Sequence, residues 1–386
     1  MQATETSNLH PATGSPAQID SSSSWAGLAG SGLQYREEAT LLKSVNKIIS
    51  TTIQYWSPKA LYTAVSLGVP DALAAAGGPQ TAAEIARRVG AKEASLLQRL
   101  LRALAANGFF TESEDEDPRY GLNETSNLLT SQGPFAGFVL HECEPASWLA
   151  WDKLTEAIQN GVHEGTYPFE LATGGKSFFG YYKEHKESAK WFNDAMQTWS
   201  LVQGHALLEH YAGFKSLTGT LVDVGGNRGV MLSKILAQNP NINGGVVFDL
   251  PHVLKQEGVV RQPNVRLVGG DMFKEVPKAD AIFMKMICHD WDDEACIKLL
   301  RNCHNALPVG GKLLVVEVVV ANPGQTGKET LYSKEFDLHM LALLGGGKER
   351  TERQWRNLLE GGGFEVVGMT PCPSVALQHV IEGVKK

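Results

Sequence analysis

Hydrophobic positions recur at helical spacing between Glu37 and Phe110, where apolar residues return every three to four positions. The widest apolar stripe consists of leucines: Leu96, Leu97, Leu100, Leu101 and Leu104. Gly108 follows this stripe and is expected to end its helix. Thr81 and Glu84 have the spacing of a capping box, which predicts a helix start. We therefore expect this segment to be a helical domain.

Two short hydrophobic runs, Phe109-Phe110 and Tyr120-Gly121-Leu122, follow these helices and flank an acidic turn. Helices followed by such a hairpin have a winged-helix layout, which serves either for DNA recognition or for packing. The acidic run Glu112–Asp117 would repel phosphates where a wing should touch DNA. The formal net charge of −7 also argues against a general nucleic-acid binder. We expect a packing module and no nucleic-acid partner.

A second helical region is expected from about Glu144 to Tyr211, with an interruption near Gly161–Gly175. This region concentrates Trp, Phe and Tyr residues. We expect most of these rings to be core residues and some to line a pocket for a flat or apolar ligand.

After Leu217 the pattern changes to β-branched runs that alternate with helical segments. The expected strands are Leu221–Val224, Gly245–Phe248, Val265–Val268, Ala281–Met284 and Leu313–Val320. Helices are expected around Val230–Ala237 and Glu294–Leu307. This alternation predicts an α/β fold with a doubly wound, Rossmann-like parallel sheet. The last two runs, Phe364–Val367 and His379–Val384, have no helix between them and predict a closing antiparallel pair.

These patterns divide the chain into four expected segments. They are a disordered tail (1–36), a helical winged-helix-like domain (37–135), a helical linker (136–212) and the α/β domain (213–386). The tail is rich in Ser, Gly and Ala, and it matches neither a secretory signal nor a mitochondrial transit peptide. No apolar run approaches the roughly 20 residues that span a bilayer. We expect a cytoplasmic protein with no membrane partner, and leave organellar targeting open.

The first expected strand of the α/β domain leads into a glycine-rich corner. Gly225 and Gly226 permit a tight turn there and let backbone N–H groups approach a ligand. Asp249 ends the next strand, 24 positions after Gly225. That spacing is near the ~20 positions expected for a carboxylate that binds ribose hydroxyls. The loop alone would equally suit a nicotinamide dinucleotide.

The next two strand ends narrow the choice of ligand. Asp271 follows the third strand, where its carboxylate could accept from an adenine amino group, and Met272 could pack on the ring. Lys285 ends the fourth strand, close to the same ligand by topology. Together these residues predict a nucleoside-sized ligand at the carboxyl edge of the sheet.

Several motifs occur in one order along the chain: Leu221–Pro251, Gly270-Asp271-Met272-Phe273, Lys285-Met286-Ile287-Cys288-His289-Asp290-Trp291 and Lys348-Glu349-Arg350-Thr351. With these motifs the chain resembles the plant-type caffeate and flavonoid O-methyltransferases over residues 40–386. The resemblance implies S-adenosylmethionine as the cofactor and a small-molecule methyl acceptor. It also implies a homodimer with interlocked N-terminal helices, so that residues 37–135 are a dimerisation domain and residues 136–212 contribute to the acceptor pocket.

The resemblance further implies a set of cofactor-binding residues: Gly225, Gly226, Asp249, Leu250, Asp271, Met272 and Lys285. The chain departs from the family at Asn227-Arg228, where relatives usually carry small residues. We expect Arg228 to point away from the cationic sulfonium or to contact the cofactor carboxylate indirectly.

The candidate catalytic residue is His289, just after the fourth strand. A phenolic acceptor has a pKa near 10, so at neutral pH its methylation needs a base. The family match assigns this role to His289 and places Glu317 and Glu349 beside it, where carboxylates would orient the imidazole. We expect no metal, because no cluster has ligand spacing, and the five cysteines are expected to be reduced thiols.

The resemblance also places an apolar set in the acceptor pocket: Phe192, Met196, Trp199, Met340 and Leu344. Trp199 and Leu344 replace positions that are polar in lignin-type relatives, so we do not expect lignin precursors as substrates. Two alternatives stay open. One is S-methylation of a thioether such as 4-methylthio-2-hydroxybutyrate, in dimethylsulfoniopropionate biosynthesis, whose sulfonium product aromatic faces could stabilise. The other is a degenerate methyltransferase fold that acts as a scaffold or regulator.

Overall fold

The computed structural model describes residues 36–255, 258–373 and 378–386. The predicted tail therefore lies outside the described residues, apart from Arg36. The chain divides into two compact units, residues 1–56 and 57–386. Of the first unit the structure describes the helix α2 (Arg36–Ile53) and the residues up to Trp56.

The N-terminal part of the second unit has the expected helices and hairpin. Its helices are α3 (Trp56–Ser66, shared with the first unit), α4 (Val69–Ala76), α5 (Ala82–Val89), α6 (Ala94–Ala106) and the short α7 (Glu124–Asn127). The strands β1 (Gln80–Thr81), β2 (Thr111–Glu112) and β3 (Arg119–Gly121) form a small antiparallel sheet. Thr81 and Glu84 form the predicted capping box at the start of α5.

The central region is more continuously helical than the sequence predicted. Its helices are α8 (Ala136–Cys143), α9 (Pro145–Asp152), α10 (Leu154–Asn160), α11 (Pro168–Ala172), α12 (Phe178–Glu184) and α13 (Lys186–His210). The prediction of an interruption near Gly161–Gly175 was only partly right, because α11 lies inside it. Pro168 occupies the first turn of α11, and Glu170 accepts a hydrogen bond from the Tyr167 N–H, so this short helix is capped locally.

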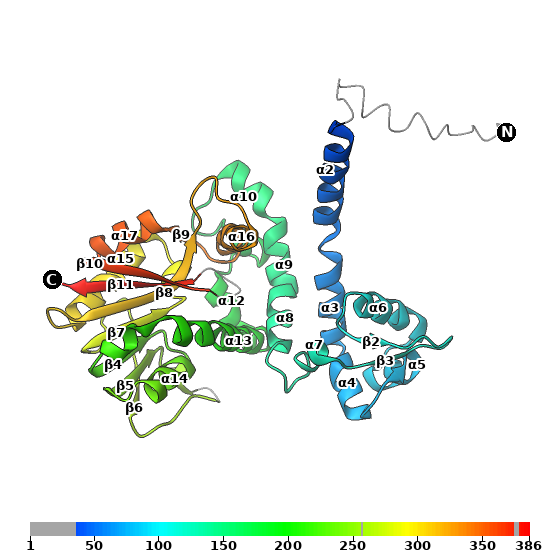
Figure 1. Cartoon of the computed structure of the whole chain (residues 1–386), viewed down its shortest axis with the longest axis horizontal. Coiled ribbons are helices and arrows are strands. Elements are labelled where there is room, and N and C mark those ends of the chain that lie inside the picture. Colours follow the sequence, from blue (N-terminus) through cyan, green and yellow to red (C-terminus); the bar gives the residue numbers. More distant parts are fainter. Residues whose placement is uncertain (1–35, 256–257, 374–377) are drawn as a thin grey trace, which may run out of the picture. The chain divides into compact units, whose positions relative to one another are not determined.

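The large sheet contains every strand that the sequence predicted. Its strands are β4 (Gly219–Val224), β5 (Ile242–Asp249), β6 (Val265–Gly269), β7 (Ala281–Lys285), β8 (Lys312–Val320), β10 (Phe364–Cys372) and β11 (Gln378–Lys385). Their order is β10-β11-β8-β7-β4-β5-β6, and the short β9 (Arg350–Thr351) pairs with β8. Strands β4 to β8 run parallel to one another, whereas β11 runs antiparallel to both β8 and β10 (Figure 1).

Helices cover both faces of this sheet. The helices of this domain are α14 (Val230–Gln238), α15 (Asp293–Ala306), α16 (Lys328–Leu343) and α17 (Glu352–Gly361). The domain also contains the 3-10 turns η1 (Ala212–Ser216), η2 (Val253–Lys255) and η3 (Cys288–Asp290). Side chains alternate between the two faces of a strand. Ile282 and Met284 of β7 pack with α15 and α17, whereas Ala281 and Phe283 pack with α14 and the end of α13.

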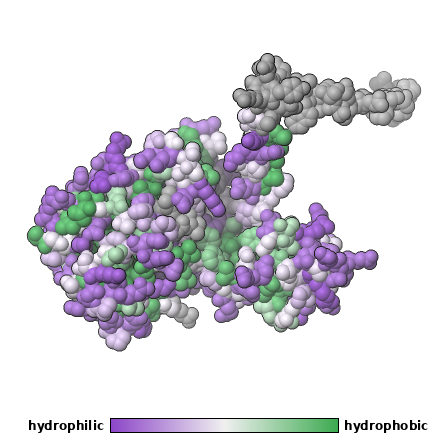
Figure 2. Space-filling view, viewed as in Figure 1, coloured by the Kyte–Doolittle hydropathy of each residue, from purple (hydrophilic) through white to green (hydrophobic). Residues whose placement is uncertain are grey.

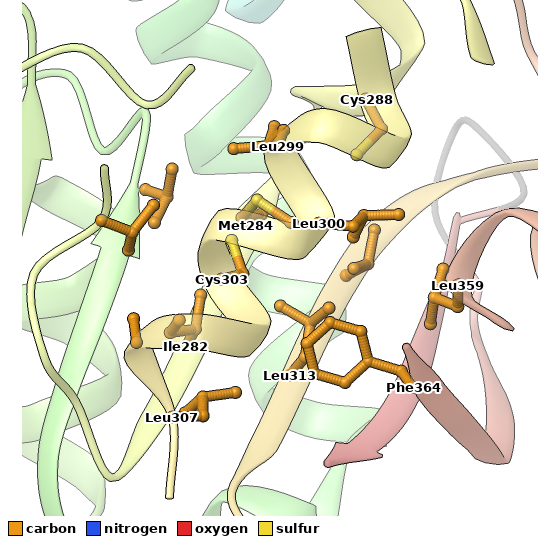
Figure 3. Close-up of a cluster of buried hydrophobic side chains, with 14 of the residues drawn as sticks. Ile282, Met284, Cys288, Leu299, Leu300, Cys303, Leu307, Leu313, Leu359 and Phe364 are labelled. Carbon is orange, nitrogen blue, oxygen red and sulfur yellow. The ribbon is translucent and has the colours of Figure 1, made fainter. Parts of the chain in front are cut away.

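Figure 3 shows the first of these two cores, in which leucines and Cys303 of α15 face Ile282, Met284 and Leu313 of the sheet. All five cysteines of the chain are buried and unpaired, as predicted. Hydrophilic residues cover much of the visible surface, with apolar patches among them (Figure 2). Among the described helices, none has the length and apolar character needed to cross a membrane.

Candidate functional site

The glycine corner at the end of β4 leaves no room for side chains. Gly225 has a φ of 70°, and a Cβ at this position would lie 2.3 Å from Cδ1 of Ile287. A Cβ on Gly226 would lie 2.8 Å from the Cγ atom of Asp223. Asn227 follows with a φ of 48°, a conformation that Asn tolerates better than most residues. The corner therefore needs glycine at position 225. Asn227, where the chain departs from the family pattern, is compatible with the turn.

Asp249 holds this corner in place from the end of β5. One carboxylate oxygen accepts the Asn227 N–H at 2.8 Å, and the other accepts the Leu250 N–H at 2.7 Å. Burial raises the pKa of Asp249, and these two hydrogen bonds oppose the rise. The carboxylate therefore lies beside the corner, where the sequence predicted it.

The other predicted cofactor residues lie at the neighbouring strand ends. Asp271 follows β6 and is part-exposed, and its carboxylate accepts the Phe273 N–H at 2.9 Å. Met272 packs against the core that α15 covers. Lys285 ends β7 and donates to Oε1 of Gln203 on α13 at 3.2 Å. Burial lowers the pKa of Lys285 to about 8, against the opposing charge of Asp223.

Arg228 turns toward α13. Its guanidinium donates to Oε1 of Gln197 and lies 3.6 Å from Oδ1 of Asp194. The residue at the unusual family position therefore pairs with a helix of its own chain.

His289 lies on η3, between β7 and α15. Its Nδ1 is 2.8 Å from Oε1 of Glu349, and its Nε2 is 3.2 Å from Oδ1 of Asp290. The imidazole is 8% exposed and the Glu349 side chain 0%. Asp292, not Asp290, caps α15 by accepting the Ala295 N–H, so Asp290 is free to face the imidazole.

The carboxylates around His289 decide its protonation. Burial lowers the pKa of the imidazole, but the charges of Asp290, Glu349 and Glu317 outweigh this effect and raise the pKa to about 10. An imidazole in this setting holds a proton strongly. Once it has accepted a proton, the imidazolium is stabilised by its neighbours.

Glu317 supports the turn that carries His289. Its Oε1 accepts the N–H groups of Ile287 at 3.0 Å and Cys288 at 2.8 Å, so its hydrogen bonds reach the backbone and not the ring. Oε2 of Glu317 is buried and has no hydrogen-bond partner among the described residues. The sequence placed Glu317 near the imidazole, but could not distinguish a bond to the ring from a bond to its backbone.

His289, Glu317 and Glu349 also form a possible metal-ligand set. One ligand atom from each lies within 4.8 Å of the others, and the described part of the chain holds no other such group. Sequence spacing did not reveal this cluster, because its members come from three separate segments. The present hydrogen bonds engage His289 and Glu349 with each other, and the absence of a metal stays a prediction.

Arg350 is a site residue that the sequence argument did not single out. Its guanidinium is fully buried and donates to the carbonyl oxygens of Cys288 at 3.0 Å and Trp291 at 2.8 Å. It also donates to Oδ1 of Asp293 at 2.9 Å. These bonds fix the backbone on both sides of His289. Its place beside Glu349 in the Lys-Glu-Arg-Thr motif was the available signal.

The predicted acceptor residues lie on α13, on α16 and at Leu344, directly after α16. Met340 and Leu344 are buried in a cluster with Phe178 and Tyr182, and Phe192 of α13 packs against the same cluster.

The ring of Trp199 lies 6.3 Å from that of Phe336 and 5.4 Å from that of Phe138. Met196 is half-buried on α13. His141, on α8, is buried, and its Nδ1 is 3.2 Å from the Tyr182 hydroxyl oxygen.

Comparison with known sequences identifies the family. A family model for the O-methyltransferase domain matches residues 151–365, and one for the O-methyltransferase dimerisation domain matches residues 50–132. The chain belongs to the O-methyltransferase family.

Two relatives and one solved structure illustrate the similarity. Tabersonine 16-O-methyltransferase of Catharanthus roseus is 35% identical over 82% of this chain and 91% of its own length. Nicotinate N-methyltransferase 1 of Glycine max is 39% identical over 80% of this chain and 87% of its own. The structure of a calicheamicin-biosynthesis methyltransferase in its S-adenosylhomocysteine-bound form is 28% identical, covers 89% of this chain and 99% of that one, and has a TM-score of 0.71.

Three predictions are thereby confirmed. The fold is a doubly wound methyltransferase sheet with an N-terminal helical dimerisation domain, the protein is an S-adenosylmethionine-dependent methyltransferase of small molecules, and it is an enzyme. The scaffold alternative has no support.

The strand-end residues fit S-adenosylmethionine. The glycine corner at 225 offers backbone without side chains, and Asp249 and Asp271 stand at neighbouring strand ends. Oδ1 of Asn227 is buried without a hydrogen-bond partner among the described residues, which leaves an acceptor for a donor of the cofactor.

We expect Gly225→Ala to weaken S-adenosylmethionine binding at least about tenfold, because the added methyl combines a clash at Ile287 with backbone strain. Isothermal titration calorimetry measures the change. Gly78→Ala is the matched control, since a Cβ there meets nothing within 4 Å and its φ is not positive. Equal affinities in the two variants would contradict this view of the corner.

Proposed function

We propose that this enzyme methylates a hydroxyl group of an aromatic small molecule, with His289 as the general base. The observation that carries the proposal is the buried contact of 2.8 Å between His289 Nδ1 and Glu349 Oε1. A carboxylate in this position orients an imidazole and stabilises its protonated form.

The cofactor would be held by the residues at the carboxyl edge of the sheet: Gly225, Gly226, Asp249, Leu250, Asp271, Met272 and Lys285. When bound, S-adenosylmethionine supplies a methyl group on a positively charged sulfonium, which is already a good leaving group. The chain's own contribution is then to position the acceptor and to take up its proton.

His289 takes that proton at Nε2. Its Nδ1–H donates to Glu349, which fixes the tautomer, and Nε2, which lies 3.2 Å from Oδ1 of Asp290, would exchange that contact for the acceptor oxygen. The nearby Asp290 carboxylate adds to the stabilisation of the imidazolium.

Glu317 and Arg350 act on the backbone of the same turn. Glu317 accepts the N–H groups that precede the imidazole, and Arg350 donates to the carbonyls of Cys288 and Trp291. In this proposal Glu317 and Glu349 are functional partners of His289, but only Glu349 bonds to the ring.

The acceptor would lie against a hydrophobic surface built from Phe192, Met196, Trp199, Met340 and Leu344. These side chains suit a flat aromatic molecule. A thioether acceptor has no proton to lose and would leave the His289–Glu349 pair without a role, so a hydroxyl acceptor is the better fit.

The dimerisation-domain match at residues 50–132 supports a homodimer. In this proposal residues 37–135 are the dimer-forming part, and the enzyme works in the cytoplasm. Helix α6 offers a surface for such contacts, because Leu96 is 57% exposed. A hollow of about 620 Å³ on this surface is lined by Leu96, Arg99, Leu100, Arg102, Ala103 and Ala106.

We expect His289→Ala to lower methyl transfer to a hydroxyl acceptor by about 10²–10⁴-fold, because the base is lost. Transfer of labelled methyl groups to a panel of phenols and hydroxylated heterocycles measures the loss, and calorimetry should show unchanged S-adenosylmethionine affinity. His205→Ala, with a side chain 86% exposed, is the control. In the wild type, kcat/KM should rise with pH toward about 10, where the imidazole becomes neutral. Nearly full activity of His289→Ala would rule out base catalysis.

We expect Leu96→Glu to shift the enzyme from dimer toward monomer, because a charge replaces apolar surface on α6. Light scattering coupled to size-exclusion chromatography measures the mass. Leu331→Glu, at a position 50% exposed on α16, is the control. A monomeric wild type, or a dimer unaffected by Leu96→Glu, would sink the assignment of this surface.

A further inference from the structure

A charged side chain contacts His339, which aromatic contacts connect to His289. Glu142, near the end of α8, has a side chain that is 24% exposed, and its Oε2 lies 3.6 Å from Nε2 of His339 on α16. Among the described residues, no Lys or Arg lies within 4 Å of this carboxylate. The predicted acceptor set was wholly apolar, so this carboxylate adds a charge that the sequence argument did not include.

Aromatic contacts connect this pair to the catalytic centre. The ring of His339 stacks on Phe336 with 5.8 Å between ring centroids, and Phe336 lies 6.0 Å from the ring of His289. The ring of Trp151 lies 6.1 Å from that of His339. The ring of Phe336 therefore lies next to both His289, the candidate base, and His339, the partner of Glu142.

The electrostatics agree with this placement. Burial raises the pKa of Tyr332, and the charges of Glu142 and Glu349 raise it further, so Tyr332 senses both carboxylates. Burial lowers the pKa of His339, in spite of the opposing charge of Glu142. A neutral imidazole leaves the carboxylate charge uncompensated, among rings that themselves favour cations at their faces.

We propose that Glu142 and His339 form a second recognition point for the methyl acceptor, which selects aromatic hydroxyl compounds that also carry a protonated amine and rejects those that carry a carboxylate. This inference rests on the proposed function, because it assumes that the acceptor hydroxyl reaches His289. A cation placed here gains an ion pair with Glu142 and contacts with Trp151 and Phe336, whereas an anion meets the like charge of Glu142.

Three phenols with the same ring test the proposal: tyramine carries a cation, tyrosol is neutral, and para-hydroxyphenylacetate carries an anion. Calorimetric titration into the full-length enzyme with S-adenosylhomocysteine measures each affinity. We expect tyramine to bind at least about tenfold more tightly than para-hydroxyphenylacetate, with tyrosol between them. In Glu142→Gln, which keeps the shape and removes the charge, this preference should fall below about threefold.

The exposed Glu164→Gln is the matched control and should keep the wild-type order. His339→Phe is the second variant and should weaken tyramine binding less than Glu142→Gln does. Equal affinities of the wild type for all three phenols, preference for the anion, no binding of tyramine, or an unchanged order in Glu142→Gln would each overturn the proposal.

The outcome is separable from that of the proposed function. If methyl transfer to the phenol panel is lost in His289→Ala while Glu142→Gln leaves the charge preference unchanged, the base assignment stands and the recognition point fails. If His289→Ala keeps its activity, the proposed function fails whatever the binding order.

Discussion

The buried contact between His289 and Glu349 is the interaction on which the rest of this site depends. Its partners lie 60 positions apart, and burying an ionisable pair costs more than a surface pair unless the geometry is held firmly. Neighbouring side chains fix this geometry. Glu317 takes the N–H groups of the His289 turn, and the Arg350 guanidinium takes its carbonyls.

The sheet explains how these groups meet. Strands β7 and β8 are adjacent and parallel, so the turn after β7 and the Glu317 side chain on β8 lie near the same edge. Strand β9 pairs with β8 and begins at Arg350, which brings Glu349 to that edge as well. The proposed cofactor residues follow β4, β5 and β6, and Lys285 ends β7 itself, so in this proposal the base and the methyl donor share one rim of the sheet.

The sequence predicted the parts of this arrangement that depend on local patterns. Runs of β-branched residues predicted every strand of the parallel sheet, and the Thr81–Glu84 spacing predicted the capping box that the structure contains. The short helix α11 was missed, because its capping by Glu170 is a side-chain contact in a stretch without helical periodicity.

The contacts between site residues could be predicted from the sequence only in part. Motif order indicated His289 and Glu349, but whether Glu317 bonds to the ring or to its backbone depends on side-chain conformation and not on spacing. The pair of Glu142 and His339 lies on two helices far apart in sequence, and the identity of either residue alone gives no reason to expect the contact. Long-range contacts between single side chains leave no periodic signal.

A histidine-selective NMR titration tests the central claim most directly, by measuring the pKa of the His289 imidazole in the wild type and in Glu349→Gln. The account predicts a wild-type pKa well above the ordinary value near 6.5, toward about 10, and a clear decrease when the Glu349 charge is removed. A pKa at or below 6.5 in the wild type, or one that does not change in Glu349→Gln, would contradict it.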